Sequence, residues 1–103
     1  MYVGNDFDPS DVGEIENYGF DFTAILGVGE TIVSATWVCS VVNGTDPSPS
    51  SRLYGTPINT TTITTQKIST LLGGVQYRLQ AIATTSFGQV LSLWSHVTCN
   101  VPS

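Results

Sequence analysis

The residues able to do covalent chemistry or to bind a transition metal are few and widely separated in this chain of 103 residues. His96 is the only histidine, so a Ser-His-Asp or Cys-His site would have to be built around it, and no carboxylate lies near it in the sequence. Cys39 and Cys99 are too far apart for the paired spacing of a zinc site. We therefore expect no catalytic residues, no metal site and no cofactor.

Carboxylates are concentrated at the start of the chain. The first thirty residues contain no Lys or Arg and carry seven of the eight acids: Asp6, Asp8, Asp11, Glu14, Glu16, Asp21 and Glu30. Their oxygens could serve calcium, but they lack the glycine-centred loop of an EF-hand, and Pro9 interrupts them. We expect an acidic segment that is solvated or that faces a basic protein surface, and the question of ion binding stays open.

The remaining composition excludes several classes of partner. The net charge is −5, and the three cations (Arg52, Lys67 and Arg78) are too scattered to form the basic stripe that nucleic-acid binding requires. No apolar run approaches the roughly 20 residues that span a bilayer, and the polar, acidic N-terminus is unlike a signal peptide. We expect one small soluble domain without an export signal that binds neither nucleic acid nor membrane.

Apolar and polar residues alternate along most of the chain after residue 17, a period typical of half-buried strands. The strongest predicted strand covers residues 31–42 and places five residues on one face: Val33, Ala35, Trp37, Cys39 and Val41. The other predicted strands cover residues 18–24, 52–54, 58–69, 75–85 and 90–101. No stretch shows a helical period, so the fold class is all-β.

This spacing predicts an immunoglobulin-like β-sandwich of about seven strands over residues 18–103, preceded by an irregular acidic leader over residues 1–17. Trp37 lies in the middle of an early strand, as in such domains. The segment 72–77 has the pattern of a tyrosine corner, in which Tyr77 would form a hydrogen bond with the preceding turn. The predicted core packs Trp37 with Phe20, Phe22, Tyr77, Leu79, Leu91 and Leu93.

The same strand order makes a prediction about the cysteines. In an immunoglobulin-like sheet the Tyr77 strand lies between the Trp37 strand and the last strand. Two strand spacings then separate Cys39 from Cys99 by about 9.5 Å, beyond the roughly 7 Å that a disulfide bridges. We expect two free, inward-facing thiols.

Candidate interface residues come from the two ends of the chain. Alternation places Trp94 and His96 on the face opposite Leu93 and Val97, so both are expected to be partly exposed. The leader could dock onto a neighbouring subunit or pack back on its own sandwich, where it would cover Trp94. The predicted interface residues are Tyr2, Phe7, Asp8, Trp94 and His96.

Several of these segments resemble a known family. Residues 7–12 and 16–22 resemble the "DPxxV…DYxxDW" opening of small structural proteins of tailed bacteriophages, in which a leader precedes an immunoglobulin-like sandwich. Residues 29–37 are similar to their "GdtIssstW" strand, and residues 72–81 to their "GGxxYxLxA" segment. The likeness covers most of residues 7–95. Phe22 departs from it, since a Trp is common there, as does the longer Ser/Pro loop at residues 46–51.

The resemblance implies a non-enzymatic virion protein of the head–tail region, such as a fibre–tail adaptor or a capsid decoration. It implies docking onto portal or neck, tail, fibre or capsid subunits in several symmetric copies, after assembly in the host cytoplasm. The alternative is a bacterial cell-surface or carbohydrate-binding β-sandwich, with Tyr54, Trp94 or Tyr2 as a stacking platform. Against that alternative, no predicted loop carries a cluster of aromatic residues.

Overall fold

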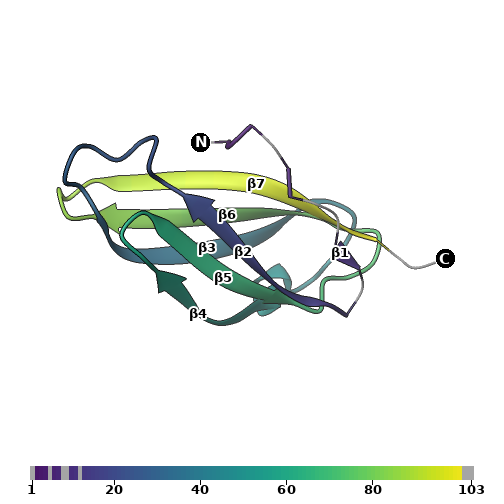
Figure 1. Cartoon of the computed structure of the whole chain (residues 1–103). Helices are drawn as coiled ribbons and strands as arrows, with labels where there is room; N and C mark the ends of the chain where they lie inside the picture. Colours follow the sequence, from purple (N-terminus) through teal and green to yellow (C-terminus); the bar gives the residue numbers. More distant parts are fainter. Residues whose placement is uncertain (1, 5, 8–9, 12, 101–103) are drawn as a thin grey trace.

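The computed structural model describes residues 2–4, 6–7, 10–11 and 13–100. Two β-sheets lie face to face (Figure 1), one with the strand order β1-β7-β6-β3 and the other with the order β2-β5-β4. The strands are β1 (Ser10–Asp11), β2 (Ile15–Asp21), β3 (Ile32–Asn43), β4 (Leu53–Asn59), β5 (Ile63–Ser69), β6 (Gln76–Thr85) and β7 (Val90–Asn100). The described residues contain one short 3-10 helix, η1 (Pro49–Arg52), and no α-helix. The predicted all-β class is confirmed.

The predicted core residues pack between the two sheets, together with further buried residues such as Tyr18, Ile68 and Val97. Trp37 stacks on Phe20 with 5.1 Å between ring centroids, and its indole N–H donates to Thr64 Oγ1 at 3.0 Å. Because Trp37 lies on β3 and Thr64 on β5, this hydrogen bond joins the two sheets. Leu91 packs against the core but is only partly buried.

A bulge at the start of β3 changes which residues face the core. The pairing with β6 shifts between Ile32 and Ser34, and one extra residue in a strand reverses the side-chain alternation on one side of it. Ile32 is therefore buried, whereas Val33 is 64% exposed. The prediction that Val33 shares the face of Trp37 is wrong.

The threonine-rich segment also differs from its prediction. A turn at residues 60–62 divides the predicted strand 58–69 into the end of β4 and the whole of β5. Thr60 stabilises this turn, since its hydroxyl accepts a hydrogen bond from the N–H of Ile63 at 3.2 Å. The predicted strands 52–54 and 58–69 are not separated at residues 55–57, because β4 continues there with a shift in its register.

The order of the last strands is as predicted, because β6 lies between β3 and β7. Cys39 and Cys99 are both buried and neither is in a disulfide, which confirms that prediction. Burial raises the pKa of the Cys39 thiol to about 12, so it remains protonated and behaves as a small apolar side chain.

Candidate functional site

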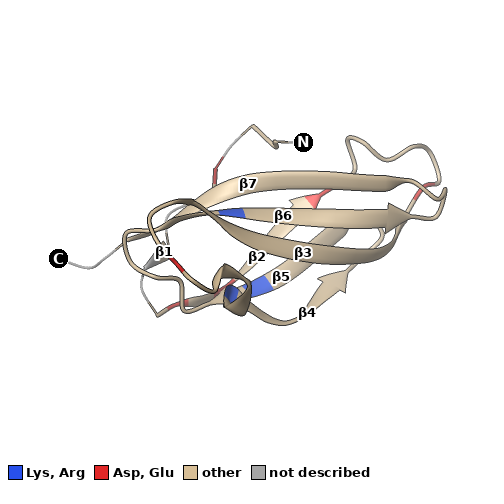
Figure 2. Cartoon of the chain, turned by 180° about the vertical axis from the view of Figure 1, so that it is seen from behind, with Lys and Arg blue, Asp and Glu red and all other residues tan. Residues whose placement is uncertain are grey.

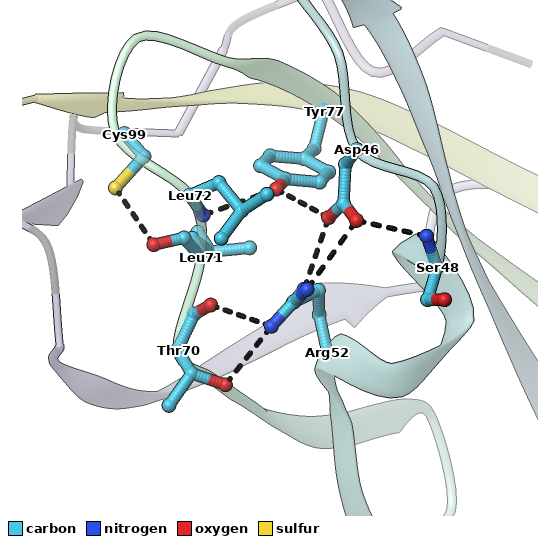
Figure 3. A network of polar contacts seen from close by, with 8 residues as sticks. All are labelled: Asp46, Ser48, Arg52, Thr70, Leu71, Leu72, Tyr77 and Cys99. Carbon is cyan, nitrogen blue, oxygen red and sulfur yellow. Dashed lines mark hydrogen bonds and ion pairs between the residues drawn. The ribbon is translucent and has the colours of Figure 1, made fainter.

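A buried polar network occupies the end of the sandwich where the loop between β3 and η1 meets the turn before β6 (Figure 3). The hydroxyl of Tyr77 accepts a hydrogen bond from the N–H of Leu72 at 3.1 Å, which is the predicted bond of the tyrosine corner. The same hydroxyl donates to Oδ2 of Asp46 at 2.6 Å. Burial, and then this bond to Asp46, raise the pKa of Tyr77 to about 12.

Asp46 is held by a second partner, Arg52. The Arg52 Nε lies 3.0 Å from Asp46 Oδ2, and the Asp46 side chain has no exposed surface. Arg52 also donates from Nη1 to the carbonyl oxygen of Thr70 at 2.9 Å. The hydrogen bond from Arg52 holds the pKa of Asp46 at about 2, so the carboxylate remains charged. Both carboxylate oxygens of Asp46 accept hydrogen bonds from within the chain. We therefore assign this network a structural role.

The described part of the leader lies along β7 of its own sandwich (Figure 1). The N–H of Val3 donates to the carbonyl oxygen of Trp94 at 3.1 Å, and that of Phe7 donates to the carbonyl oxygen of His96 at 2.9 Å. Farther along, β1 pairs with β7 in the parallel direction. This is the second of the two arrangements that the sequence allowed, and it places leader side chains beside those of β7.

Three rings meet where the start of the leader lies beside β7. The ring centroid of Trp94 lies 4.8 Å from that of Tyr2 and 5.3 Å from that of His96. We call these residues the ring cluster. Arg78 lies beside it, with its Cζ 5.7 Å from the Trp94 centroid, within the range of a cation–π contact. Tyr2 is 40% exposed and the other two rings are half-buried, so the cluster remains open to a partner.

Asp6 adds a carboxylate to the ring cluster. Its Oδ1 accepts a hydrogen bond from the Tyr2 hydroxyl at 2.7 Å, which raises the pKa of Tyr2. The same oxygen lies 3.9 Å from Nδ1 of His96, and the two form an ion pair when the imidazole is protonated. One exposed cluster thus offers aromatic surface, a cation and a carboxylate.

Phe7 lies apart from the ring cluster. The half-buried ring of Phe7 faces the core of its own chain, with its centroid 4.8 Å from that of Tyr18 and 5.4 Å from that of Phe20. Phe7 therefore anchors the leader. Asp8 lies outside the described residues.

Sequence patterns predicted neither the buried network around Asp46 nor the contacts of Asp6 and Arg78 with the ring cluster. The pairing of Asp46 with Arg52 could have been predicted, since Asp46 is the only acid in the sequence after residue 30 and lies six residues before Arg52. Asp6 and Arg78 reach the ring cluster only through the pairing of the leader and of β6 with β7, for which no local signal exists.

Within the described ranges, no group of three His, Cys, Asp or Glu residues could hold a metal ion. No helix there is long and apolar enough to cross a membrane.

A β-sandwich with a self-contained polar network and an exposed aromatic cluster has the features of a protein that works through contact surfaces. Residues 10–94 match the family described as podophage GP4 fiber-tail adaptor protein gp77, and the chain belongs to this family. It is a structural component of a bacteriophage virion with an adaptor role, as the sequence resemblance predicted. No curated protein and no solved structure shows significant similarity to the chain.

Proposed function

We propose that this chain is a non-enzymatic, immunoglobulin-like module that joins a phage tail to its fibre by docking through the ring cluster. The observation that carries the proposal is the contact of Tyr2 with Trp94 and His96 on the outer surface of β7. Family membership supports tail and fibre subunits as the partners. The tyrosine corner and the central Trp37 support the immunoglobulin-like assignment.

The composition of the ring cluster suits docking. Tyr, Trp and Arg are the residues most enriched among those that dominate binding energy at interfaces, and all three are present in or beside the cluster. Phe7 is anchored in the core, and Tyr2 is bonded to Asp6 in the same leader. The cluster is thus ordered before a partner arrives, which lowers the entropic cost of association.

The arrangement also suits repeated use around a symmetric tail. The leader and β7 present one continuous surface on each copy, so every copy would offer the same contacts to its neighbour. We propose that several copies surround the tail, assemble there in the host cytoplasm, and use the acidic leader, including Asp8, against a basic partner surface.

The test is particle incorporation of Tyr2→Ala and Trp94→Ala, measured by quantitative mass spectrometry of purified virions and compared with the melting temperature of each free protein. Phe87→Ala is the matched control, because Phe87 is an aromatic residue that is 59% exposed in the β6–β7 turn. We expect both cluster variants to fold and to lose incorporation at least tenfold, with the control unchanged. Normal incorporation of both variants would overturn the proposal.

A further inference from the structure

The outer face of the β2-β5-β4 sheet carries a second surface feature, which the adaptor role does not use. A shallow hollow of about 230 Å³ lies there, lined by side chains from all three strands. Four of them carry polar groups that could contact a ligand: Asn17 on β2, Tyr54 on β4, and Thr65 and Lys67 on β5. Ligand pockets for drug-sized molecules measure about 300–1,000 Å³, so this hollow suits a smaller unit.

The hollow depends on a bulge in β4. Tyr54 pairs with Lys67 and Ile58 pairs with Thr65, so three residues of β4 lie opposite one residue of β5. Gly55 within the bulge has φ +74°, a conformation that glycine adopts without strain. Bulges of this kind bend a strand and redirect its side chains, and they are frequent beside binding sites.

A buried amide holds the bulge in place. The side chain of Gln66 is 2% exposed, and its Nε2 lies 3.0 Å from the carbonyl oxygen of Tyr54 and 3.2 Å from that of Gly55. These hydrogen bonds satisfy two carbonyl groups where the pairing between β4 and β5 shifts. The backbone of Tyr54 is therefore held by a hydrogen bond from a side chain in the interior of the sandwich.

The side chains around the hollow form a specific set. Lys67 is paired across the sheet with Tyr54 on one side and with Asn17 on the other, so the three form a row. Cross-strand neighbours of this kind have Cβ atoms about 4.5–5.5 Å apart. The next row contains Gly19, Thr65 and Ile58. The ring of Tyr54, which is 54% exposed, thus lies beside an amide, a hydroxyl and an ammonium group.

These polar groups are available for a ligand. Among the described residues, no side-chain hydrogen bond is made by Asn17, Thr65 or Lys67, and no carboxylate forms an ion pair with Lys67. Lys67 lies on β5, Arg78 on β6 and Arg52 at the end of η1, and Figure 2 shows a basic segment on each of these elements. An exposed ammonium without a carboxylate favours a ligand that brings one.

We propose that this hollow binds one acidic sugar unit, a hexuronic acid residue of a polysaccharide. The apolar face of the pyranose ring would stack on Tyr54, and its hydroxyl groups would exchange hydrogen bonds with Asn17 and Thr65. Its carboxylate would pair with Lys67. The site lies on the opposite sheet from the ring cluster, so it adds a ligand to the adaptor role without replacing that role.

The experiment is an NMR titration of the ¹⁵N-labelled full chain with glucuronic acid and, in parallel, with glucose. We expect saturable shifts confined to β2, β4 and β5, with dissociation constants of about 1–10 mM for glucuronic acid, a range ordinary for such weak ligands. Glucose should bind at least threefold more weakly. Absence of saturable shifts, or shifts centred on the ring cluster, would overturn the proposal.

Three variants separate the contributions. Tyr54→Ala should abolish binding of both sugars, whereas Lys67→Gln should remove only the preference for the uronic acid. Phe87→Ala is the matched exposed-aromatic control and should bind as the wild type does. Melting temperatures confirm that each variant is folded, which we expect because all three side chains are exposed.

Particle incorporation distinguishes this proposal from the proposed function. Tyr54→Ala should enter virions normally, whereas the ring-cluster variants should not. If Tyr54→Ala loses incorporation and the wild type binds no uronic acid, the hollow is a protein contact and the sugar proposal is wrong. If the sugar binds and the ring-cluster variants assemble normally, the docking proposal alone fails.

Discussion

Asp46 connects parts of the chain that are distant in sequence. It accepts hydrogen bonds from Tyr77, Arg52 and the N–H of Ser48, and its side chain is fully buried. We expect Asp46→Ala to destabilise the domain by about 3–5 kcal/mol, because removing one partner of a buried ion pair leaves the other without compensation. Chemical denaturation measures the loss. Asp21→Ala is the control, since Asp21 is exposed and, among the described residues, its side chain bonds to Thr23 alone, two positions on. Its effect should stay below about 1 kcal/mol.

The same carboxylate makes stability depend on pH. Its pKa is about 2 in the folded chain against 3.8 ordinarily, so ionised Asp46 stabilises the fold above the unfolded value. That contribution is lost as the pH falls from about 4 towards 2. The stability difference between the wild type and Asp46→Asn should be constant above about pH 5 and shrink below about pH 4, as denaturation at each pH would show. A difference that persists unchanged to pH 2 would contradict this account.

Trp37 combines apolar burial with a hydrogen bond between the sheets, and two substitutions separate these contributions. Trp37→Ala should cost about 3–5 kcal/mol, enough to unfold most of a small domain. Trp37→Phe retains most of the apolar contact, and Thr64 keeps its bond to Asn59 Oδ1, so we expect a loss of about 1 kcal/mol. Thermal melts followed by circular dichroism compare them. A Trp37→Ala melting temperature within a degree or two of the wild type would refute the core assignment.

At the scale of single elements, the bulge in β4 depends on Gln66. Gln66→Leu keeps a buried side chain of similar size but removes the donor to the carbonyl oxygens of Tyr54 and Gly55. We expect a loss of about 1–3 kcal/mol, the usual cost of leaving buried polar groups without a partner. Gln80→Leu is the control, because Gln80 is half-buried and makes a single 3.3 Å bond to Ser92, so it should lose less than about 1 kcal/mol. Equal losses in the two variants would show that Gln66 does not hold the bulge.

The leader is the element that closes the β7 edge. Deleting residues 2–7 removes the Phe7 ring from Tyr18 and Phe20 and exposes the unpaired side of β7. We expect the free energy of unfolding to fall by about 2–4 kcal/mol and the protein to self-associate, because an exposed strand edge pairs with other chains. Sedimentation velocity at several concentrations measures the association. A truncated protein that stays monomeric would show that the leader is not needed to protect this edge.

Phe7→Ala separates anchoring from edge protection. It removes only the buried ring and leaves the hydrogen bond from the N–H of Phe7 to His96. It should lower the stability without the self-association expected for the deletion.

Alternation predicted most strands because β2, β3, β6 and β7 each bury one face. Alternation gave wrong predictions at two places. The bulge beside Ile32 reverses the alternation within β3. Around the β4–β5 turn, Ile58 and Ile63 are exposed at 69% and 38%, so the apolar residues there do not indicate which face is buried. The exposure of Trp94 and His96 followed from alternation as well. The register of the leader on β7 did not, because parallel pairing between the chain ends leaves no local trace.

At the scale of the whole molecule, the two proposed surfaces lie on different sheets. The ring cluster is on the outer side of the β1-β7-β6-β3 sheet, and the hollow is on the outer side of the β2-β5-β4 sheet. The core between them is formed by close packing of Trp37, Phe20 and their neighbours. A partner on one face therefore leaves the other accessible, and one adaptor could hold a protein and a sugar together.

The pairing of the leader with β7 also sets an order of events during synthesis. Ser10 pairs with Cys99, and Val3 bonds to Trp94, so neither contact can form until the last strand has left the ribosome. At a synthesis rate of about 5–20 residues per second, β7 is completed on the order of 5–20 s after the leader. Throughout that interval Tyr2 and Phe7 have no β7 strand to pack against. The leader is therefore synthesised first and is among the last parts of the chain to reach its place in the fold.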